Sequence, residues 1–387
     1  MVMRSFASKA GRLVGQAPFR VLARAQELER QGKKILHFEI GEPDFNTPAH
    51  IKEEAKRALD NDFTHYVNAN GILELREAVC DEVEASYGFR PALEQVLITP
   101  GANPIIYFTV SCLVDEGEEV IVQDPGFITY YAVLQYLGVK TTLVPLKEEN
   151  EFRMSPDDVR KRVTKRTKLI ILNSPQNPTG SVMLKREVEE IAEIAREHDI
   201  YLLSDEIYRK MTYDLEHHSP AVFDQCKERT MILDGLSKAY AMTGWRLGYC
   251  VAPAPLIEKM GLLLQTIASC TTSFVQKGSI AALKGPQDPI ALMMKEFRKR
   301  RDAIVSGLNS VPKLRCINPQ GAFYVFPNIT GTGMTSQEFT DFLLNDLGIA
   351  VLPGTAFGPS GEGYIRMSYA TSLETIHKAM DRMRSAL

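Results

Sequence analysis

Short apolar runs rich in β-branched residues alternate with helical patterns through the middle of the chain. These runs cover residues 95–101, 118–125, 168–175, 200–208, 230–238 and 247–253. Each run is apolar on both faces, which is typical of a strand buried on both sides of a sheet. A helical pattern at residues 185–199 places Val188, Ile191 and Ala195 on one stripe. The alternation predicts an α/β fold with a mostly parallel sheet.

The pattern changes after about residue 285. A long charged helix is predicted over residues 293–310, followed by short strands at 321–327, 348–354 and 364–370 and by a terminal helix. This order is typical of a second, smaller α+β domain. We therefore expect an N-terminal arm with part of the small domain at 1–45, a large domain at 46–285, and the small domain at 286–387.

Composition narrows the function classes. The 387 residues are 44% hydrophobic and 24% charged, with a net charge of -3, which gives no long-range attraction for nucleic acid or anionic membrane. The longest nearly apolar run, residues 104–114, is far shorter than the roughly 20 residues that span a bilayer. The six cysteines show no CxxC spacing, which indicates reduced thiols in a cytoplasm and no metal site.

The first twenty residues are basic and contain no acidic residue. Two interpretations stay open. The segment is similar to a weak organellar transit peptide, or it is an arm that packs on a partner subunit.

Polar groups follow five of the predicted strands. The segments TPGAN, DPGF, NSPQNPTG, SDEIY and GLSK each come where an apolar run ends. Ligands of parallel α/β sheets bind beyond the carboxyl ends of the strands, so these segments predict one shared pocket.

Two charged residues in these segments have alternative interpretations. Asp205 is either a desolvated carboxylate that needs a cation opposite it or the N-cap of a helix. Lys238 is either an amine whose pKa is lowered by burial, ready to form a Schiff base, or a lysine whose head reaches water. Neither residue, taken alone, distinguishes a functional role from a structural one.

A phosphate site is the third element of the pattern. The Gly101–Ala102 turn opens an apolar helix, Ser237 supplies a hydroxyl beside Lys238, and Arg246 supplies a guanidinium. A Schiff-base lysine, a buried aspartate facing a pyridinium nitrogen and a phosphate cradle together describe a site for pyridoxal 5'-phosphate.

The motifs carrying these residues resemble those of a known family. In order, they are GEPDF (41–45), YVNANGILELREAV (66–79), NSPQNPTG (173–180), SDEIY (204–208), SKAYAMTGWRLGY (237–249) and IRMSYA (365–370). In these motifs the chain resembles class I and II aminotransferases of fold type I, the aspartate/aromatic aminotransferase-like enzymes. The resemblance implies a three-layer sandwich around the central sheet and a smaller α+β domain.

The resemblance also implies a role for each site residue. Lys238, Asp205 and Tyr208 would be catalytic, with Lys238 joined to the cofactor as a Schiff base and Asp205 paired with the ring nitrogen. Tyr208 and Asn177 would bind the phenolate oxygen, and Phe127 would stack on the ring where many relatives carry tryptophan or tyrosine. The phosphate would be bound by Gly101, Ala102, Asn103, Ser237 and Arg246, together with Tyr66 from the second subunit of a homodimer. Gly41, Asn177 and Arg366 would bind the substrate.

The implied activity is transfer of an amino group between an L-amino acid and a 2-oxo acid, with glutamate and 2-oxoglutarate as one pair. Asn103 stands where aspartate-preferring relatives often carry lysine, which puts aspartate in doubt as a substrate. A C–S β-lyase on the same scaffold is the alternative reaction. An aminotransferase-like sensor of a transcription regulator would need a DNA-binding module, and none fits before GEPDF.

Overall fold

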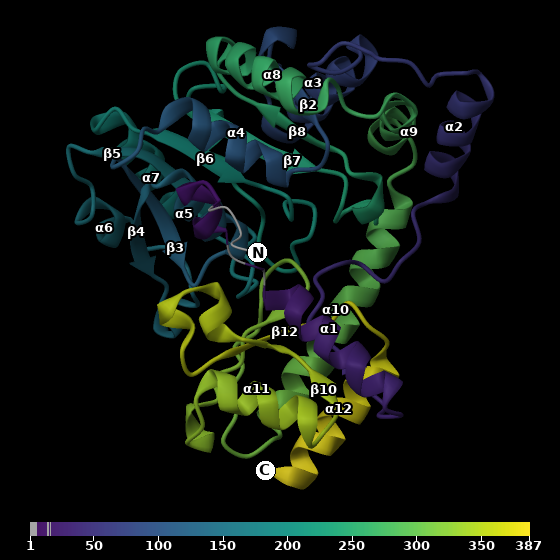
Figure 1. Cartoon of the computed structure of the whole chain (residues 1–387), viewed down its shortest axis with the longest axis vertical. Coiled ribbons are helices and arrows are strands. Elements are labelled where there is room, and N and C mark those ends of the chain that lie inside the picture. The colour runs from purple at the N-terminus through teal and green to yellow at the C-terminus, as the bar shows by residue number, and fades with distance from the viewer. Residues whose placement is uncertain (1–5, 14, 16) are drawn as a thin grey trace, which may run out of the picture.

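A seven-stranded sheet forms the centre of the larger part of the molecule (Figure 1). The computed structural model describes residues 6–13, 15 and 17–387, so residues 1–5, 14 and 16 of the predicted N-terminal arm lie outside it. The strand order is β2-β8-β7-β6-β5-β3-β4, and β8 is antiparallel to both of its neighbours while the other pairs are parallel. Its strands are β2 Val96–Thr99, β3 Glu119–Asp124, β4 Lys140–Pro145, β5 Thr167–Asn173, β6 Tyr201–Asp205, β7 Thr230–Gly235 and β8 Gly248–Val251.

Helices cover both faces of this sheet, because successive strand residues point to opposite faces. In β6, Leu203 packs in the core under α4, α5 and α8, whereas its neighbour Leu202 packs under α7 on the other face. The helices of this part are α2 Ala49–Asp60, α3 Leu73–Tyr87, α4 Asn103–Leu113, α5 Ile128–Leu137, α6 Pro156–Arg160, α7 Lys185–Glu197, α8 Ala254–Ala268 and α9 Ser273–Lys284. The predicted three-layer α/β sandwich is confirmed.

Some details of the predicted strands were wrong: the run 230–238 extends beyond β7, which ends at Gly235, and the strand predicted at 348–354 is divided into two short strands, at Ile349–Ala350 and Leu352–Pro353. The sequence patterns did not include β4, an edge strand whose residues are mostly only partly buried and therefore show no doubly apolar run. The run 200–208 was predicted as one strand, but β6 ends at Asp205. The amide of Ile207 donates to the Asp205 carboxylate instead of to a neighbouring strand, so the chain turns there.

The smaller part combines residues 17–37 with residues 288–387, whereas the 3-10 helix Ser8–Arg12 lies beside α5 of the larger part (Figure 1). Strand β1 Leu36–His37 pairs in parallel with β10 Ile349–Ala350, and β11 Leu352–Pro353, β12 Ile365–Ser368 and β9 Tyr324–Val325 form an antiparallel sheet. Its helices are α1 Ala17–Arg30, α10 Asp288–Asn309, α11 Ser336–Asn345 and α12 Leu373–Ala386. Stacked aromatic rings of Phe297 and Phe323 lie in its core.

Short 3-10 helices complete the described secondary structure. They are Ser8–Arg12, Leu93–Gln95, Glu148–Asn150, Pro220–Val222, Thr243–Trp245, Thr330–Thr332, Gly354–Phe357 and Pro359–Gly361. Among the residues that the structure describes, no helix is long and apolar enough to cross a membrane, and no group of three His, Cys, Asp or Glu side chains is placed to hold a metal ion. All six cysteines are free thiols.

Candidate active site

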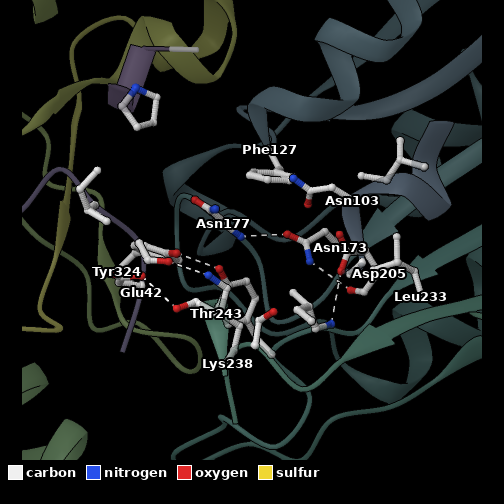
Figure 2. A pocket seen from close by; sticks show the side chains of 18 of the residues that line it. Glu42, Asn103, Phe127, Asn173, Asn177, Asp205, Leu233, Lys238, Thr243 and Tyr324 are labelled. Atoms are coloured by element: carbon white, nitrogen blue, oxygen red, sulfur yellow. Dashed lines mark hydrogen bonds between the residues drawn. The ribbon is translucent and has the colours of Figure 1, made fainter. Parts of the chain in front are cut away.

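A pocket of about 290 Å³ opens at the carboxyl ends of the central strands (Figure 2). Eleven of the predicted site residues line it: Gly41, Ala102, Asn103, Phe127, Asn177, Asp205, Tyr208, Ser237, Lys238, Arg246 and Arg366. Gly101 lies beside it, against the guanidinium of Arg246. Tyr66 is not part of the lining and is 87% exposed on the surface. The five polar segments that follow the strands thus meet at one place.

Lys238 lies just after β7 and is partly buried. Its Nζ donates a 2.6 Å hydrogen bond to the carbonyl oxygen of Gly41, and the rings of Tyr208 and Phe323 lie within 6 Å of it, at 5.9 and 5.8 Å. Burial, reinforced by the positive charge of Arg366, lowers the pKa of Lys238 to about 8. A substantial fraction of this amine is therefore neutral near physiological pH and able to act as a nucleophile or a base.

Asp205 is the last residue of β6 and is 4% exposed. The Tyr130 hydroxyl donates to its Oδ2, and the amide of Ile207 donates to its Oδ1 over 3.3 Å. Burial raises the pKa of Asp205 to about 7, and the hydrogen bond from Tyr130 offsets only part of that rise. No cationic side chain in the described part of the chain forms an ion pair with this carboxylate. A protonated ring nitrogen placed in the pocket would supply the missing positive charge.

The start of α4 has the properties of a phosphate cradle. The helix begins at Asn103 with no side-chain cap, so its first amide groups are available to an anion. A Cβ atom on Gly101, which has a φ of +90°, would lie 2.3 Å from Nη2 of Arg246. A Cβ on Gly248 would lie 2.6 Å from the amide nitrogen of Ala102. Both glycines therefore let the turn and the guanidinium come close together.

Arg366 projects from β12 into the opposite side of the pocket and is 3% exposed. Its Nη1 donates to Asn177 Oδ1 over 3.1 Å, and its Nη2 donates to the backbone oxygen of Glu39 over 2.5 Å. Its Nε is buried and has no hydrogen-bond partner among the residues that the structure describes. An uncompensated buried donor on a guanidinium is well suited to a carboxylate ligand.

Three residues of the site were missed by the sequence reasoning. The Asn173 side chain donates to the backbone oxygens of Asp205 and Pro175 and accepts from the amide of Asn177, so it holds two functional segments in place. Asn173 is the first residue of the NSPQNPTG motif, so its place in that motif could have identified it as a site residue. Tyr130 and Tyr324 had no such signal, because each occurs in an apolar stretch that predicts only core packing.

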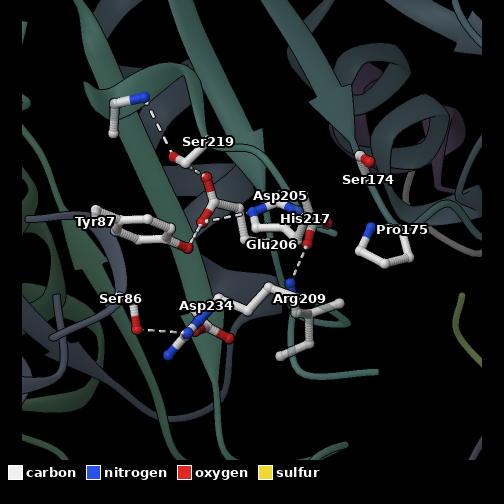
Figure 3. Close-up of polar contacts among 12 residues, drawn as sticks. Ser86, Tyr87, Ser174, Pro175, Asp205, Glu206, Arg209, His217, Ser219 and Asp234 are labelled. Atoms are coloured by element: carbon white, nitrogen blue, oxygen red, sulfur yellow. Dashed lines mark hydrogen bonds and ion pairs between the residues drawn. The ribbon is translucent and has the colours of Figure 1, made fainter. Parts of the chain in front are cut away.

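A second polar cluster lies next to the pocket on the other face of the sheet (Figure 3). The fully buried Glu206 accepts hydrogen bonds from the hydroxyls of Tyr87 and Ser219, and His217 Nε2 lies 3.3 Å from its carboxylate. Burial alone would raise the pKa of Glu206, but His217 and these donors hold it below its usual value. Among the described residues, Glu206 therefore has a basic side chain beside it, whereas Asp205 forms no ion pair.

These features fit the chemical groups of pyridoxal phosphate. The uncapped amides of α4 and the Arg246 guanidinium would bind its phosphate. Asp205, which forms no ion pair among the described residues, would face its ring nitrogen, and Lys238, whose pKa is lowered, would react with its aldehyde. Phe127, at the N-terminus of α5, lines the same pocket and supplies an aromatic face.

Comparisons with known proteins agree with this geometry. Residues 33–383 match the family Aminotransferase class I and II. The aspartate aminotransferase of Pyrococcus abyssi is 44% identical over 359 residues, 92% of each chain. The aromatic-amino-acid aminotransferase 2 of Thermococcus litoralis is 43% identical over 357 residues, 91% of this chain and 92% of that protein. The structure of Thermus thermophilus aspartate aminotransferase with maleate, 35% identical, superposes over 100% of both chains with a TM-score of 0.96.

The family and the fold predicted from the motifs are therefore confirmed. The two sequence relatives carry different substrate names, so they establish the type of reaction without establishing the amino donor. The chain belongs to the aminotransferase class I and II family and is a pyridoxal phosphate-dependent aminotransferase of fold type I.

Proposed function

We propose that this enzyme moves an amino group between an L-amino acid and a 2-oxo acid, with glutamate and 2-oxoglutarate as one pair, and that Lys238 is its catalytic base. The observation that supports this most is the presence of Lys238, Asp205, Arg246 and Arg366 around one pocket. Among the described residues, Asp205 has no ion-pair partner and Arg366 Nε has no hydrogen-bond partner, and a cofactor–substrate complex would provide both.

The cofactor is held at four points in this proposal. Arg246, Ser237 and the amides of Ala102 and Asn103 bind its phosphate, and Gly101, whose own amide donates to the carbonyl of Thr99, forms the turn that brings them together. Asp205 binds the ring nitrogen, and Tyr208 and Asn177 bind the phenolate oxygen. Phe127 lies against the ring. When bound, pyridoxal phosphate supplies an aldehyde that condenses with amines and a ring that delocalises negative charge from the substrate Cα.

Arg366 binds the substrate, and Lys238 transfers its proton. Arg366, with Asn177 and Gly41, binds the α-carboxylate and orients the Cα–H bond. Lys238 Nζ accepts the Cα proton and later donates a proton, acting first as general base and then as general acid. Its pKa of about 8 suits both tasks, because about a tenth of the amine is neutral at pH 7 and about half at pH 8, while the rest carries the proton.

The donor amino acid is expected to have an uncharged side chain. The cations that line the pocket in the described chain are Lys238, Arg246 and Arg366, and each already has a role in the proposal. The remaining wall contains Pro18, Phe19 and Ile40, which are apolar, and Asn103, a neutral amide. An aromatic or aliphatic donor fits such a wall better than aspartate, and the distal carboxylate of glutamate must be bound by groups from the second subunit.

A homodimer with shared sites is part of the proposal. Tyr66 is 87% exposed, and the adjacent loop residues Val67–Asn70 lie against α8, whose Leu262 and Ile267 are also exposed, at 52% and 58%. An aromatic residue and two apolar side chains of this exposure support an interface with a second copy of the chain. In that dimer Tyr66 binds the phosphate of the partner's site.

Two further proposals concern the chain as a whole. We place the large domain at 46–285, the small domain at 286–387, and an N-terminal arm with part of the small domain at 1–45. The pairing of β1 with β10 supports this division, while Ser8–Arg12 of the arm packs on the large domain, where Arg12 pairs with Glu116. We place the protein in the cytoplasm, which the six free thiols support.

A panel of half-reactions tests the function. The purified enzyme is mixed with one amino acid at a time, without any oxo acid, and its absorbance is followed as the cofactor is converted to the pyridoxamine form. Conversion with glutamate and with neutral or aromatic amino acids, but not with aspartate, is the expected result. Steady release of ammonia and pyruvate from a β-substituted amino acid would instead show the eliminating reaction.

A further inference from the structure

Tyr324 is an aromatic side chain that contacts both halves of the proposed site. It belongs to β9, lines the pocket and is 1% exposed. Its hydroxyl lies 2.8 Å from the hydroxyl of Tyr208, and its ring centroid lies 4.6 Å from the guanidinium carbon of Arg366. A single residue therefore touches the side chain proposed for the cofactor's phenolate oxygen and the side chain proposed for the substrate's carboxylate.

The register of the small sheet explains the contact with Arg366. Tyr324 pairs with Ser368 of β12, and Arg366 lies two residues before Ser368. Residues two apart on a strand point to the same face, so the Tyr324 ring and the Arg366 guanidinium are diagonal neighbours. The ring of Phe357 lies 5.0 Å from the guanidinium carbon as well, so Arg366 contacts two aromatic rings.

Either hydroxyl could donate in the hydrogen bond between Tyr324 and Tyr208, and the proposed function determines which one does. If Tyr208 donates its proton to the phenolate oxygen, then its own oxygen must accept the proton of the Tyr324 hydroxyl. A hydroxyl that accepts a hydrogen bond becomes a stronger donor, because the two bonds polarise each other. Tyr324 would thereby strengthen the hydrogen bond that Tyr208 makes.

Gly41 restricts where the Tyr324 hydroxyl can lie. A Cβ atom on Gly41 would be 2.3 Å from that hydroxyl oxygen, and the carbonyl of the same glycine accepts the hydrogen bond from Lys238. The hydroxyl is therefore enclosed between Tyr208 and the backbone of the residue that contacts Lys238.

From this geometry we infer that Tyr324 is a positioning residue that couples the two ends of the site: its hydroxyl sets the hydrogen-bond strength of Tyr208, and its ring fixes the guanidinium of Arg366. The inference rests on the proposed roles of Tyr208 and Arg366. It assigns two separable effects to one side chain, which two different substitutions can separate.

Tyr324→Phe removes the hydroxyl and keeps the ring. A hydrogen bond donated to the phenolate oxygen makes that oxygen less basic and so lowers the pKa of the Lys238 nitrogen in the bound cofactor. Without the Tyr324 hydroxyl, the hydrogen bond from Tyr208 should be weaker. The pH midpoint of the bound cofactor's absorbance change should therefore rise. The expected rise is about half a pH unit, the size of one neutral hydrogen bond. The affinity for a 2-methyl amino acid, which binds but has no Cα proton, should stay within about twofold, because the ring remains.

Tyr324→Leu removes the ring as well. The affinity for the 2-methyl amino acid should then fall roughly tenfold, because Arg366 loses a desolvated cation–π contact. Since Tyr324→Leu also removes core packing, Tyr324→Phe tests the hydroxyl effect in a protein that keeps its core.

The matched control is Tyr369→Phe. The hydroxyls of Tyr369 and Tyr213 lie 2.9 Å apart in the same core, and neither residue lines the pocket. Tyr369→Phe removes a comparable tyrosine–tyrosine hydrogen bond and should change neither the midpoint nor the affinity.

Tyr208→Phe separates this inference from the proposed function. A raised midpoint in both Tyr208→Phe and Tyr324→Phe supports the coupling. A raised midpoint in Tyr208→Phe alone overturns the role of the Tyr324 hydroxyl and leaves the proposed function intact. An unchanged midpoint in Tyr208→Phe overturns the proposed role of Tyr208 and, with it, the hydroxyl effect. A Tyr324→Leu enzyme that binds the 2-methyl amino acid as tightly as the wild type overturns the role of the ring.

Discussion

Lys238 Nζ and the carbonyl oxygen of Gly41 lie 2.6 Å apart although the two residues are 197 positions apart in the sequence. The contact joins the segment that follows β1 to the end of β7. It places the Lys238 amine beside the backbone that is proposed to bind the substrate's carboxylate. The reacting amine and the substrate-binding segment are thus fixed relative to each other.

The first prediction concerns this amine. Lys238→Ala should lower the rate of amino transfer by at least about 10²–10⁴-fold, because the general base is lost. Borohydride reduction followed by peptide mass spectrometry should find the cofactor on Lys238 in the wild type and no covalent cofactor in the variant. Lys259→Ala, which changes an exposed lysine paired only with Glu258, is the control and should behave as the wild type. Retained turnover in Lys238→Ala would refute the assignment.

The second prediction concerns the pH dependence of stability of the cofactor-free protein. The pKa of Asp205 is raised from 3.8 to about 7 by burial, so between these values the folded protein keeps a proton that the unfolded chain releases. The free energy of unfolding should therefore fall as the pH rises from about 4 to about 7, by up to about 4 kcal/mol from this group, and should level off above that range. Urea unfolding at a series of pH values measures it.

Asp205→Asn should remove this slope, so its stability relative to the wild type should increase as the pH rises from about 4 to the shifted pKa of about 7 and should level off above it. Asp157→Asn, at an exposed carboxylate, should keep the wild-type slope. Added pyridoxal phosphate should flatten the wild-type profile, because a ring nitrogen that carries a proton pairs with the carboxylate. Identical slopes in Asp205→Asn and the wild type would contradict the interpretation of Asp205 as a carboxylate without a cation.

The third prediction concerns the phosphate cradle. Gly101→Ala would place a methyl group 2.3 Å from Nη2 of Arg246, so the guanidinium must move away from the start of α4. Affinity for pyridoxal phosphate, measured by fluorescence titration, should fall about tenfold, the loss expected for one charge-assisted hydrogen bond.

Gly117→Ala is a closely matched control. Gly117 has the same φ of +90°, and a Cβ there would meet no atom within 4 Å. Both variants should therefore lose a similar stability of about 1 kcal/mol from the strained backbone. Only Gly101→Ala should lose cofactor affinity; an equal loss in both would show that the strain, and not the contact with Arg246, is responsible.

The fourth prediction tests the shared site. If Tyr66 acts in the partner's pocket, a mixed dimer of a Lys238→Ala subunit and a Tyr66→Ala subunit contains one intact site. Random mixing of the two inactive or weak variants should restore about a quarter of the wild-type activity, since half of the dimers are mixed and each has one good site of two. Mixing Lys238→Ala with Arg366→Ala should restore nothing, because both residues come from the same chain. No recovery in the first mixture would place Tyr66 outside the partner's site.

Much of this site was predictable from the sequence because its residues interrupt strong patterns. Asp205 is the last residue of the buried strand β6, and Lys238 follows the end of the buried strand β7 at Gly235. The five polar segments at such strand ends meet at one edge of the sheet. The antiparallel β8 did not disturb this, because β2 on its far side again runs parallel to β7.

The contacts made by Tyr130 and Tyr324 were not predictable in the same way. The hydroxyl of Tyr130 reaches Asp205 from a helix 75 positions earlier, and that of Tyr324 reaches Tyr208 across 116 positions. A buried tyrosine has the same apolar signature as a buried phenylalanine, since its one polar atom leaves the hydrophobic pattern unchanged. Strand β4 was missed for the opposite reason: at the edge of the sheet, its partly exposed residues weaken the pattern.

The adjacent positions of Asp205 and Glu206 restrict how this protein can change. A slip of one residue in the pairing of β6 would exchange the faces of its side chains. It would turn Glu206, already supplied with Tyr87, Ser219 and His217, toward the pocket and move Asp205 into a cluster built for a longer side chain. Insertions or deletions within β6 should therefore be purged by selection even where the sheet itself tolerates them, since the alignment of this strand determines which carboxylate is available for chemistry.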